Sequence, residues 1–278
     1  PQFISMGLKP LDTKAWVEPD ALFPQYFDNK CRLFAHDAQA CFAETQGSRL
    51  AQEECAERLL VYLCEQHGQL YRRDEHELHI EGLADGLSLA GDAPPLMRAG
   101  FWLQDDICLL EQRAGRHVLI AASLCAPSSW YLQEKIGLPL AGIHEPVPGL
   151  NAQIGRQIEN VLERLVPLRP MQRFNWTVTD CNRLAKLDTL AAASAAIGTS
   201  ASGLYLRVER QALVRLPRSN AIAFTIRVYI YPLEQLLPID GAIAGLKAAV
   251  DAMSPAEVEY KSLLDVYPRL RQFAQQHV

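Results

Sequence analysis

The spacing of apolar residues along the chain predicts both strands and helices. The clearest strand pattern covers 204–216 and 221–233. The second run alternates strictly between an apolar series and a mixed series, which predicts one strand with two distinct faces. The link between them, 217–220, is made of Pro, Arg, Ser and Asn and suits an antiparallel connection.

Shorter patterns extend this picture on the N-terminal side of that pair. The β-rich runs 107–110 and 117–124 are separated by the turn-like stretch 113–116, which predicts a hairpin. Over 151–165 the apolar residues recur at helical spacing and charged residues take the other face, until Pro167 stops the helix.

Helix start and stop signals occur at both ends of the chain. Ser48 is placed to cap a helix over 48–65, and Gly68 follows its last turn, where a left-handed residue is common. The run Ser-Pro-Ala-Glu at 254–257 has the pattern of a capping box with proline at the first helical position. The Ala-, Ser- and Gly-rich stretch 191–203 fits either a short helix or a mobile loop.

Strands in the middle and late chain, with helices before, between and after them, predict an α+β fold with a mostly antiparallel sheet. We expect one elaborated domain over 1–278. Its predicted parts are a helical lead-in over about 1–95, a sheet-containing core over about 96–235 and C-terminal helices over about 236–278. The Gly- and Pro-rich stretch 82–95 reads as the loop between the first two parts.

Composition narrows the functional classes. About half of the 278 residues are apolar and a fifth are charged, which are globular proportions. The net charge of −5 and the scattered cations argue against nucleic acid as a partner. The chain has no apolar run near the roughly 18 residues of a membrane span, and 1–11 lacks the layout of a signal peptide. We therefore expect a cytoplasmic protein with no membrane partner.

Common catalytic and cofactor motifs are missing from the sequence. It has no GxGxxG after a strand, no GxxxxGK[ST], no GxSxG, no HExxH and no CxxCH. Its seven cysteines show no CxxC pair, which argues against a zinc ribbon, an iron–sulfur cluster or a disulfide framework. Any haem would therefore be b-type, without covalent attachment.

One histidine stands in an unusual setting. The stretch 128–149 combines Trp130, Lys135 and His144 with several glycines and prolines, and loops held rigid in this way often carry functional side chains. Residue type alone favours an ordinary loop histidine bonded to a carbonyl group. A pre-set imidazole also suits a metal ligand, and a single axial histidine is all that haem requires.

Two further groups of residues are candidates for binding. Arg207 and Glu209 share a strand face, whereas Arg210 points the opposite way, and Arg227 and Tyr229 share a face of the next strand. Such a polar patch either binds carboxylates through forked hydrogen bonds or is the solvated face of a sheet. The stretch 173–177 supplies either an aromatic and polar pair in a pocket or a core Trp176 with a turn Asn175.

Taken in order, these residues resemble a known family, the haem-dependent oxidative N-demethylase alpha-subunit-like group. The resemblance extends over nearly the whole chain, and its middle and late motifs are specific. The matching positions are 7–11 with Trp16; Pro127, Trp130, Lys135, Gly137, Leu140, Ile143, His144 and 146–148; Arg173, Asn175 and Trp176; Arg207, 209–211, Leu213 and 215–217; and 225–227.

The resemblance implies a PAS-like fold that encloses haem b. It also implies an oxidoreductase that uses O₂ to convert a secondary amine such as dimethylamine into a primary amine and formaldehyde. Electrons would come from NADPH through flavin and iron–sulfur subunits, and a folate-binding subunit would capture the formaldehyde. The chain carries neither a nucleotide loop nor a cysteine cluster, so reduction of its iron would need such a partner.

The resemblance also assigns expected roles to single residues. His144 is the expected axial ligand of the haem iron, with Trp130 and Trp176 beside the cofactor. The expected propionate contacts are Lys135, Arg207, Arg210 and Arg227. Glu209 and Tyr229 are the residue types that position an amine on the distal side.

Two other readings remain open at this point. PAS-like folds are mostly sensory, so a haem-based gas or redox sensor, or a haem carrier without turnover, is the first alternative. A haem-free scaffold or small-molecule binding module is the second. Turnover of dimethylamine with an artificial reductant separates enzyme from sensor, and absorbance separates both from the haem-free module.

Overall fold

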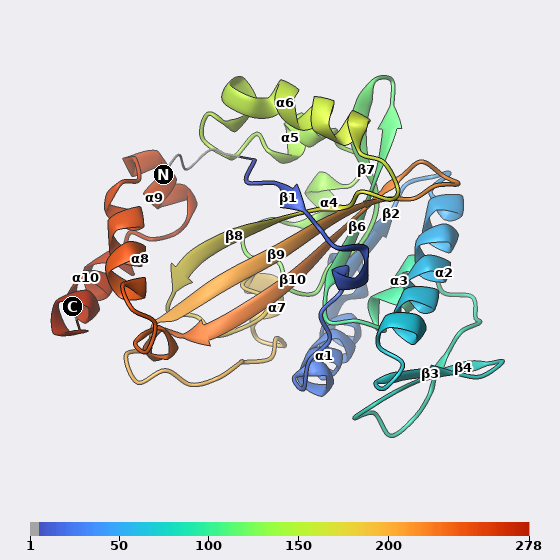
Figure 1. The fold of residues 1–278 in the computed structure, drawn as a ribbon, viewed down its shortest axis with the longest axis horizontal. Helices are drawn as coiled ribbons and strands as arrows, with labels where there is room; N and C mark the ends of the chain where they lie inside the picture. Colours follow the sequence, from blue (N-terminus) through green and yellow to red (C-terminus); the bar gives the residue numbers. More distant parts are fainter. Residues whose placement is uncertain (1–5, 278) are drawn as a thin grey trace.

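A seven-stranded antiparallel sheet in the order β1-β8-β9-β10-β6-β7-β2 forms the centre of the computed structural model, which describes residues 6–277 (Figure 1). A second sheet has the order β3-β4-β5. The α+β class predicted from the sequence is confirmed. The strands are β1 (Lys9–Pro10), β2 (Phe42–Glu44), β3 (Tyr71–Arg73), β4 (Glu77–Ile80), β5 (Leu87–Ser88), β6 (Asp106–Arg113), β7 (Arg116–Ser123), β8 (Met171–Thr179), β9 (Tyr205–Arg215) and β10 (Ile222–Pro232).

The helices lie before, between and after these strands, as expected. They are η1 (Thr13–Ala15), α1 (Phe23–Cys41), α2 (Arg49–Gln66), α3 (Pro95–Gly100), α4 (Leu132–Lys135), α5 (Leu140–Ile143), α6 (Leu150–Arg164), α7 (Asp188–Ala191), η2 (Leu233–Leu236), α8 (Ala242–Asp251), α9 (Pro255–Tyr260) and α10 (Tyr267–His277). Among the described helices, none is long and apolar enough to cross a bilayer.

The two predicted strand pairs are confirmed. Strands β9 and β10 pair along their whole length, from Ile222 opposite Arg215 to Pro232 opposite Tyr205. Strands β6 and β7 form the predicted hairpin, and its two-residue turn places both Ala114 and Gly115 at positive φ, the twist that a tight hairpin needs.

Strand β8 and the small sheet were not predicted. In β8 most side chains on both faces are half-buried, so the clean alternation of apolar and polar residues that marks a strand is absent. The stretch 71–80, expected to belong to a helical lead-in, instead carries the short strands β3 and β4, and the expected loop 82–95 carries β5. These strands are at most four residues long, too short for a periodic signal.

The predicted helices are confirmed, and Ser48 is the N-cap residue of α2, but neither its side chain nor Gly68 acts as expected. The hydroxyl oxygen of Ser48 accepts a hydrogen bond from the Gln52 side chain (2.9 Å) and caps no backbone N–H. Gly68 does not have a positive φ. A Cβ at this position would lie 2.8 Å from the carbonyl oxygen of Cys64, so the close approach of that oxygen requires a glycine. The capping box of Ser254 and Glu257 is confirmed.

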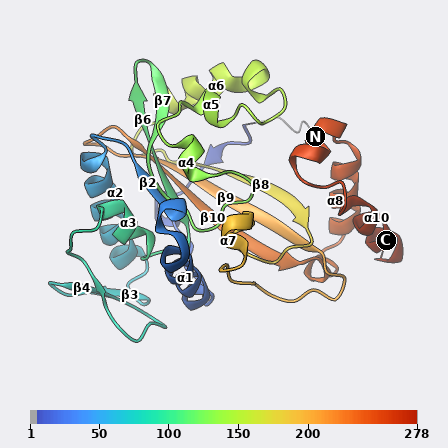
Figure 2. The same ribbon diagram turned by 180° about the vertical axis from the view of Figure 1, so that it is seen from behind.

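Helices cover both faces of the large sheet. Ala212 and Val214 of β9 and Ala223 of β10 pack with α2 and α3 in one hydrophobic cluster. Leu213 and Ile226, from the opposite face of the same strands, belong to a second cluster with residues of α4, α5 and α6. Figures 1 and 2 show α5 and α6 apart from α1, α2 and α3, while α8 to α10 lie beyond the far end of β8 to β10.

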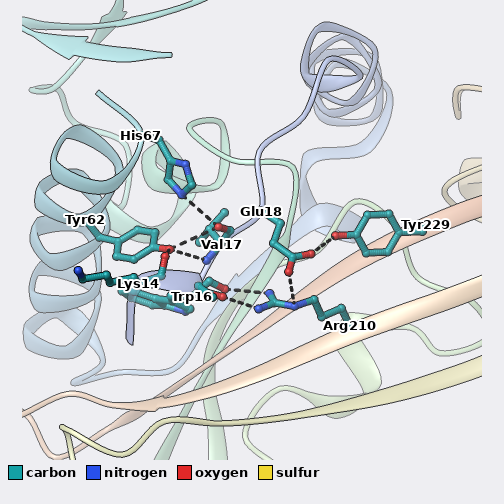
Figure 3. Close-up of polar contacts among 9 residues, drawn as sticks. Lys14, Trp16, Val17, Glu18, Tyr62, His67, Arg210 and Tyr229 are labelled. Atoms are coloured by element: carbon teal, nitrogen blue, oxygen red, sulfur yellow. Dashed lines mark hydrogen bonds and ion pairs between the residues drawn. The ribbon is translucent and has the colours of Figure 1, made fainter. Parts of the chain in front are cut away.

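Residues 12–22, here called the N-terminal strap, cross the sheet face that packs on α2 (Figure 3). The Arg210 guanidinium donates to the carbonyl oxygens of Ala15 and Trp16 and forms an ion pair with Glu18 (3.1 Å). Glu18 also accepts a hydrogen bond of 2.6 Å from the Tyr229 hydroxyl. The strap is therefore fixed to β9 and β10 by charge-assisted hydrogen bonds.

A second arginine is buried beside the first. Arg227 is fully buried, pairs with Asp20 of the strap (2.7 Å) and lies 4.1 Å from the centre of the Tyr26 ring. The charge of Arg227 also acts on Asp105. Neither carboxylate oxygen of Asp105 has a hydrogen-bond partner among the described residues. Burial raises the pKa of Asp105 to about 6, against the opposing pull of Arg227.

This carboxyl group predicts a pH dependence of stability. Its folded pKa lies above its ordinary value of 3.8, so its contribution to stability falls as pH rises from about 4 to 6 and is level above that. Relative to Asp105→Asn, we expect the free energy of unfolding of the wild type to fall by about 2 kcal/mol between pH 4.5 and 7.5. Urea unfolding at both pH values measures this loss. Asp85→Asn, at an exposed site, is the control. If the free energy of unfolding changed equally with pH in the wild type and in Asp105→Asn, the raised pKa of Asp105 would be contradicted.

Candidate functional site

A cavity of about 610 Å³ lies between the large sheet and the covering helices α5 and α6. This volume is within the range of cofactor and small-molecule sites. Strands β8, β9 and β10 form its floor, and the segment 128–150 and helix α6 form its roof. Residues from the start of the chain and from α8 and α9 close two sides.

One end of the cavity is apolar. Ile154, Ile158 and Val161 line it from α6 and remain only half-buried. Leu213 and Phe224 line it from the floor. Helix α6 thus packs Leu162 into the second hydrophobic cluster and turns the rest of its apolar face toward the cavity, which suits a ligand with a large apolar surface.

His144 follows α5 and reaches this cavity. Its backbone is fixed, because its N–H donates to Leu140 and its carbonyl accepts from Val147, each at 2.9 Å. Within the described part of the chain its imidazole makes no hydrogen bond, so the carbonyl-bonded loop histidine considered from sequence is not what the structure shows. Burial lowers the pKa of His144, and the Arg173 charge lowers it further. A neutral, unbonded imidazole is the form that binds a metal.

The other end of the cavity is polar and centres on Glu209. Its carboxylate accepts hydrogen bonds from Ser128 (3.1 Å), Asn175 (3.3 Å) and Gln211 (3.0 Å). These three donors come from a loop and two strands, so they hold the carboxylate in one orientation. Two bonds from other elements and one from its own strand make Glu209 a fixed negative charge in the cavity wall.

Lys261 directly follows α9 and lies over the cavity floor. Its ammonium donates to Asn175 Oδ1 (3.2 Å) and to the Trp176 carbonyl, and it lies 5.4 Å from the centre of the Trp176 ring. Burial lowers the pKa of Lys261 to about 8, while the nearby Glu209 charge opposes this shift. The lysine therefore titrates closer to neutral pH than an exposed one does.

Arg207 is buried in the cavity floor without a carboxylate partner among the described residues. It donates to the carbonyl oxygens of Leu184 (3.0 Å) and Ala126 (2.6 Å), and its Nε has no partner there. Burial lowers the pKa of Arg207, and Glu209 opposes that shift. Its guanidinium joins the segments on either side of β8 while keeping one donor available.

The structure brings together six of the nine residues that sequence reasoning selected. The cavity lining includes Trp130, Lys135, His144, Trp176, Arg207 and Glu209.

Arg210, Arg227 and Tyr229 lie on the opposite face of the sheet and do not line the cavity. Alternation along β9 and β10 is the reason, since Arg210 pairs with Arg227 in register and both turn away from Glu209. Their partners are Glu18 and Asp20 of the N-terminal strap.

Sequence reasoning missed several cavity residues. Arg173 belongs to a matched motif but was given no role, and Lys186, Tyr260 and Lys261 were not selected at all. Arg173 had a signal, because it precedes the Asn-Trp pair. Tyr260 and Lys261 had none, because only the packing of α9 against the sheet brings them to Glu209.

Comparison with known families agrees with the resemblance seen in the motifs. The family described as haem-dependent oxidative N-demethylase, alpha subunit-like, matches residues 7–270. Because this is nearly the whole chain, the protein belongs to that family. The description names one subunit of an assembly with other subunits.

The lysine and the glutamate at the polar end predict a titration that can be followed optically. We expect tryptophan emission to change with a midpoint near pH 8, because Lys261 loses its charge beside the Trp176 ring. Glu209→Gln should move the midpoint to lower pH, because the carboxylate that favours the charged lysine is gone. Lys261→Met should remove the transition. An unmoved midpoint in Glu209→Gln would show that the two groups do not interact.

Proposed function

We propose that this chain is the haem b-binding catalytic subunit of an oxidative N-demethylase, with His144 as the axial ligand of the iron. The observation that carries the proposal is the half-buried His144 imidazole, which lines the cavity and has no hydrogen-bond partner among the described residues. Membership of the family supports it.

The residues of the cavity fit the chemistry of haem. Haem has a broad apolar surface, two carboxylates and an iron that takes one histidine. Ile154 and Ile158 offer the apolar contact, Lys135 and Arg207 the cations for the propionates, and His144 the nitrogen. Arg207 has a buried Nε without a partner in the described chain, which is a donor available to such a carboxylate. When bound, the haem would supply the activation of O₂.

The proposed reaction removes an N-methyl group from a small secondary amine such as dimethylamine. One O₂, two electrons and two protons are consumed, and the demethylated amine, formaldehyde and water are released. We propose that flavin and iron–sulfur subunits supply the electrons and that a folate-binding subunit takes the formaldehyde.

Within this reaction the chain's own task is to hold the amine. Glu209 is fixed by Ser128, Asn175 and Gln211, so it offers a steady acceptor to the amine N–H. Tyr229, the other residue considered for this role, donates to Glu18 on the far face. Glu209 is therefore the positioning group that we retain.

The iron ligand is tested by His144→Ala. Loss of the imidazole should shift the Soret band and weaken haem binding about tenfold or more, and added imidazole should restore the band. His76→Ala, on the exposed loop before β4, is the matched control and should leave both unchanged. A Soret position and haem affinity equal to those of the wild type would rule out His144.

The activity is tested by formaldehyde release from the haem-loaded protein. Dimethylamine, O₂ and an artificial reductant should give formaldehyde and methylamine in equal amounts. A normal Soret band with no formaldehyde would favour a sensor or carrier. A protein that never acquires a Soret band would exclude both haem functions.

A further inference from the structure

The cavity wall carries more positive than negative charge. Its cationic side chains are Lys135, Arg173, Lys186, Arg207 and Lys261, and its carboxylates are Glu209 and Glu257. Two haem propionates, if the proposed function holds, would still leave the cations in excess. A small ammonium substrate would add to that excess rather than relieve it.

The excess is concentrated at the polar end. Arg173 and Lys261 both interact electrostatically with Glu209, so two cations share one carboxylate. Arg173 is mostly buried, its Nε is inaccessible to solvent, and its guanidinium makes no hydrogen bond to any described residue. A guanidinium with one N–H shielded from water and no hydrogen bond is unfavourable, so this group favours an anionic ligand in the cavity.

Glu209 alone does not balance the positive charge of Arg173 and Lys261. Its oxygens already accept three hydrogen bonds from Ser128, Asn175 and Gln211. Few lone pairs remain, and one N–H donor is enough to complete the carboxylate. The polar end therefore offers one acceptor for a cation and, beside it, the positive charges of Arg173 and Lys261 for an anion.

We propose that the amine handled in this cavity also carries a carboxylate, as an N-methyl amino acid does. Its carboxylate binds Arg173 and Lys261, and its N-methylammonium group donates to Glu209. This inference rests on the proposed function and narrows its substrate class. The reaction keeps the same balance, with the N–CH₃ bond broken, formaldehyde released and the free amino acid formed.

Binding of N-methylglycine to the full chain tests the proposal, measured by calorimetry with and without haem. We expect N-methylglycine to bind at least about tenfold more tightly than dimethylamine, since only N-methylglycine reaches both halves of the site. Arg173→Met and Lys261→Met should each weaken N-methylglycine binding about tenfold and leave dimethylamine binding unchanged or improved. Two substitutions are used so that one misfolded variant does not decide the result.

The controls separate this inference from the function on which it rests. Arg32→Met removes an exposed arginine of α1 that pairs with Asp28, and it should change neither ligand's affinity. Arg173→Lys should retain part of the N-methylglycine affinity, because it keeps the charge and loses the forked geometry. The thermal midpoint of each variant reports folding.

Three outcomes are decisive. Equal affinity for dimethylamine and N-methylglycine, or no effect of either methionine substitution, overturns the carboxylate site even where haem binds normally. Arg173-dependent binding of N-methylglycine in a protein that takes no haem keeps the site and removes the proposed function. A haem-loaded protein with Arg173-dependent binding supports both.

Discussion

The register of β9 and β10 is the constraint on which both faces of the sheet depend. It sets Arg210 directly opposite Arg227, and two like charges in that position repel each other. Both are buried, so their charges need partners nearby. Glu18 (Figure 3) and Asp20 of the N-terminal strap supply them, which explains why a segment far away in sequence lies across this face.

The same register places Arg207 and Glu209 on the other face, where packing is incomplete. Helix α6 is anchored at its C-terminal half, where Glu159 bonds His117 (2.6 Å) and Arg215 donates to the Leu165 carbonyl (2.8 Å). These anchors hold α6 beside the sheet without filling the space under its first turns. The apolar side chains there remain half-buried, and the cavity persists.

The two faces therefore use arginine in different ways. On the strap face each guanidinium has a carboxylate, which fixes the fold. On the cavity face Arg207 is held by backbone carbonyls and Arg173 has no hydrogen bond within the described chain. Cations that outnumber the nearby carboxylates are a common property of binding sites, because an anionic ligand can supply the missing negative charge.

The sequence by itself determined the periodic elements, the β9–β10 pair, the β6–β7 hairpin, α6 and the capping box of α9, and it placed Arg210 opposite in direction to Arg207. It did not reveal β8, because half-buried side chains on both faces remove the period-two signal. Only the tertiary structure decided that Arg210 and Arg227 face the strap, and that Lys261 meets Glu209. The physical reason is that alternation fixes which residues share a face, whereas what that face meets depends on packing between segments far apart in the chain.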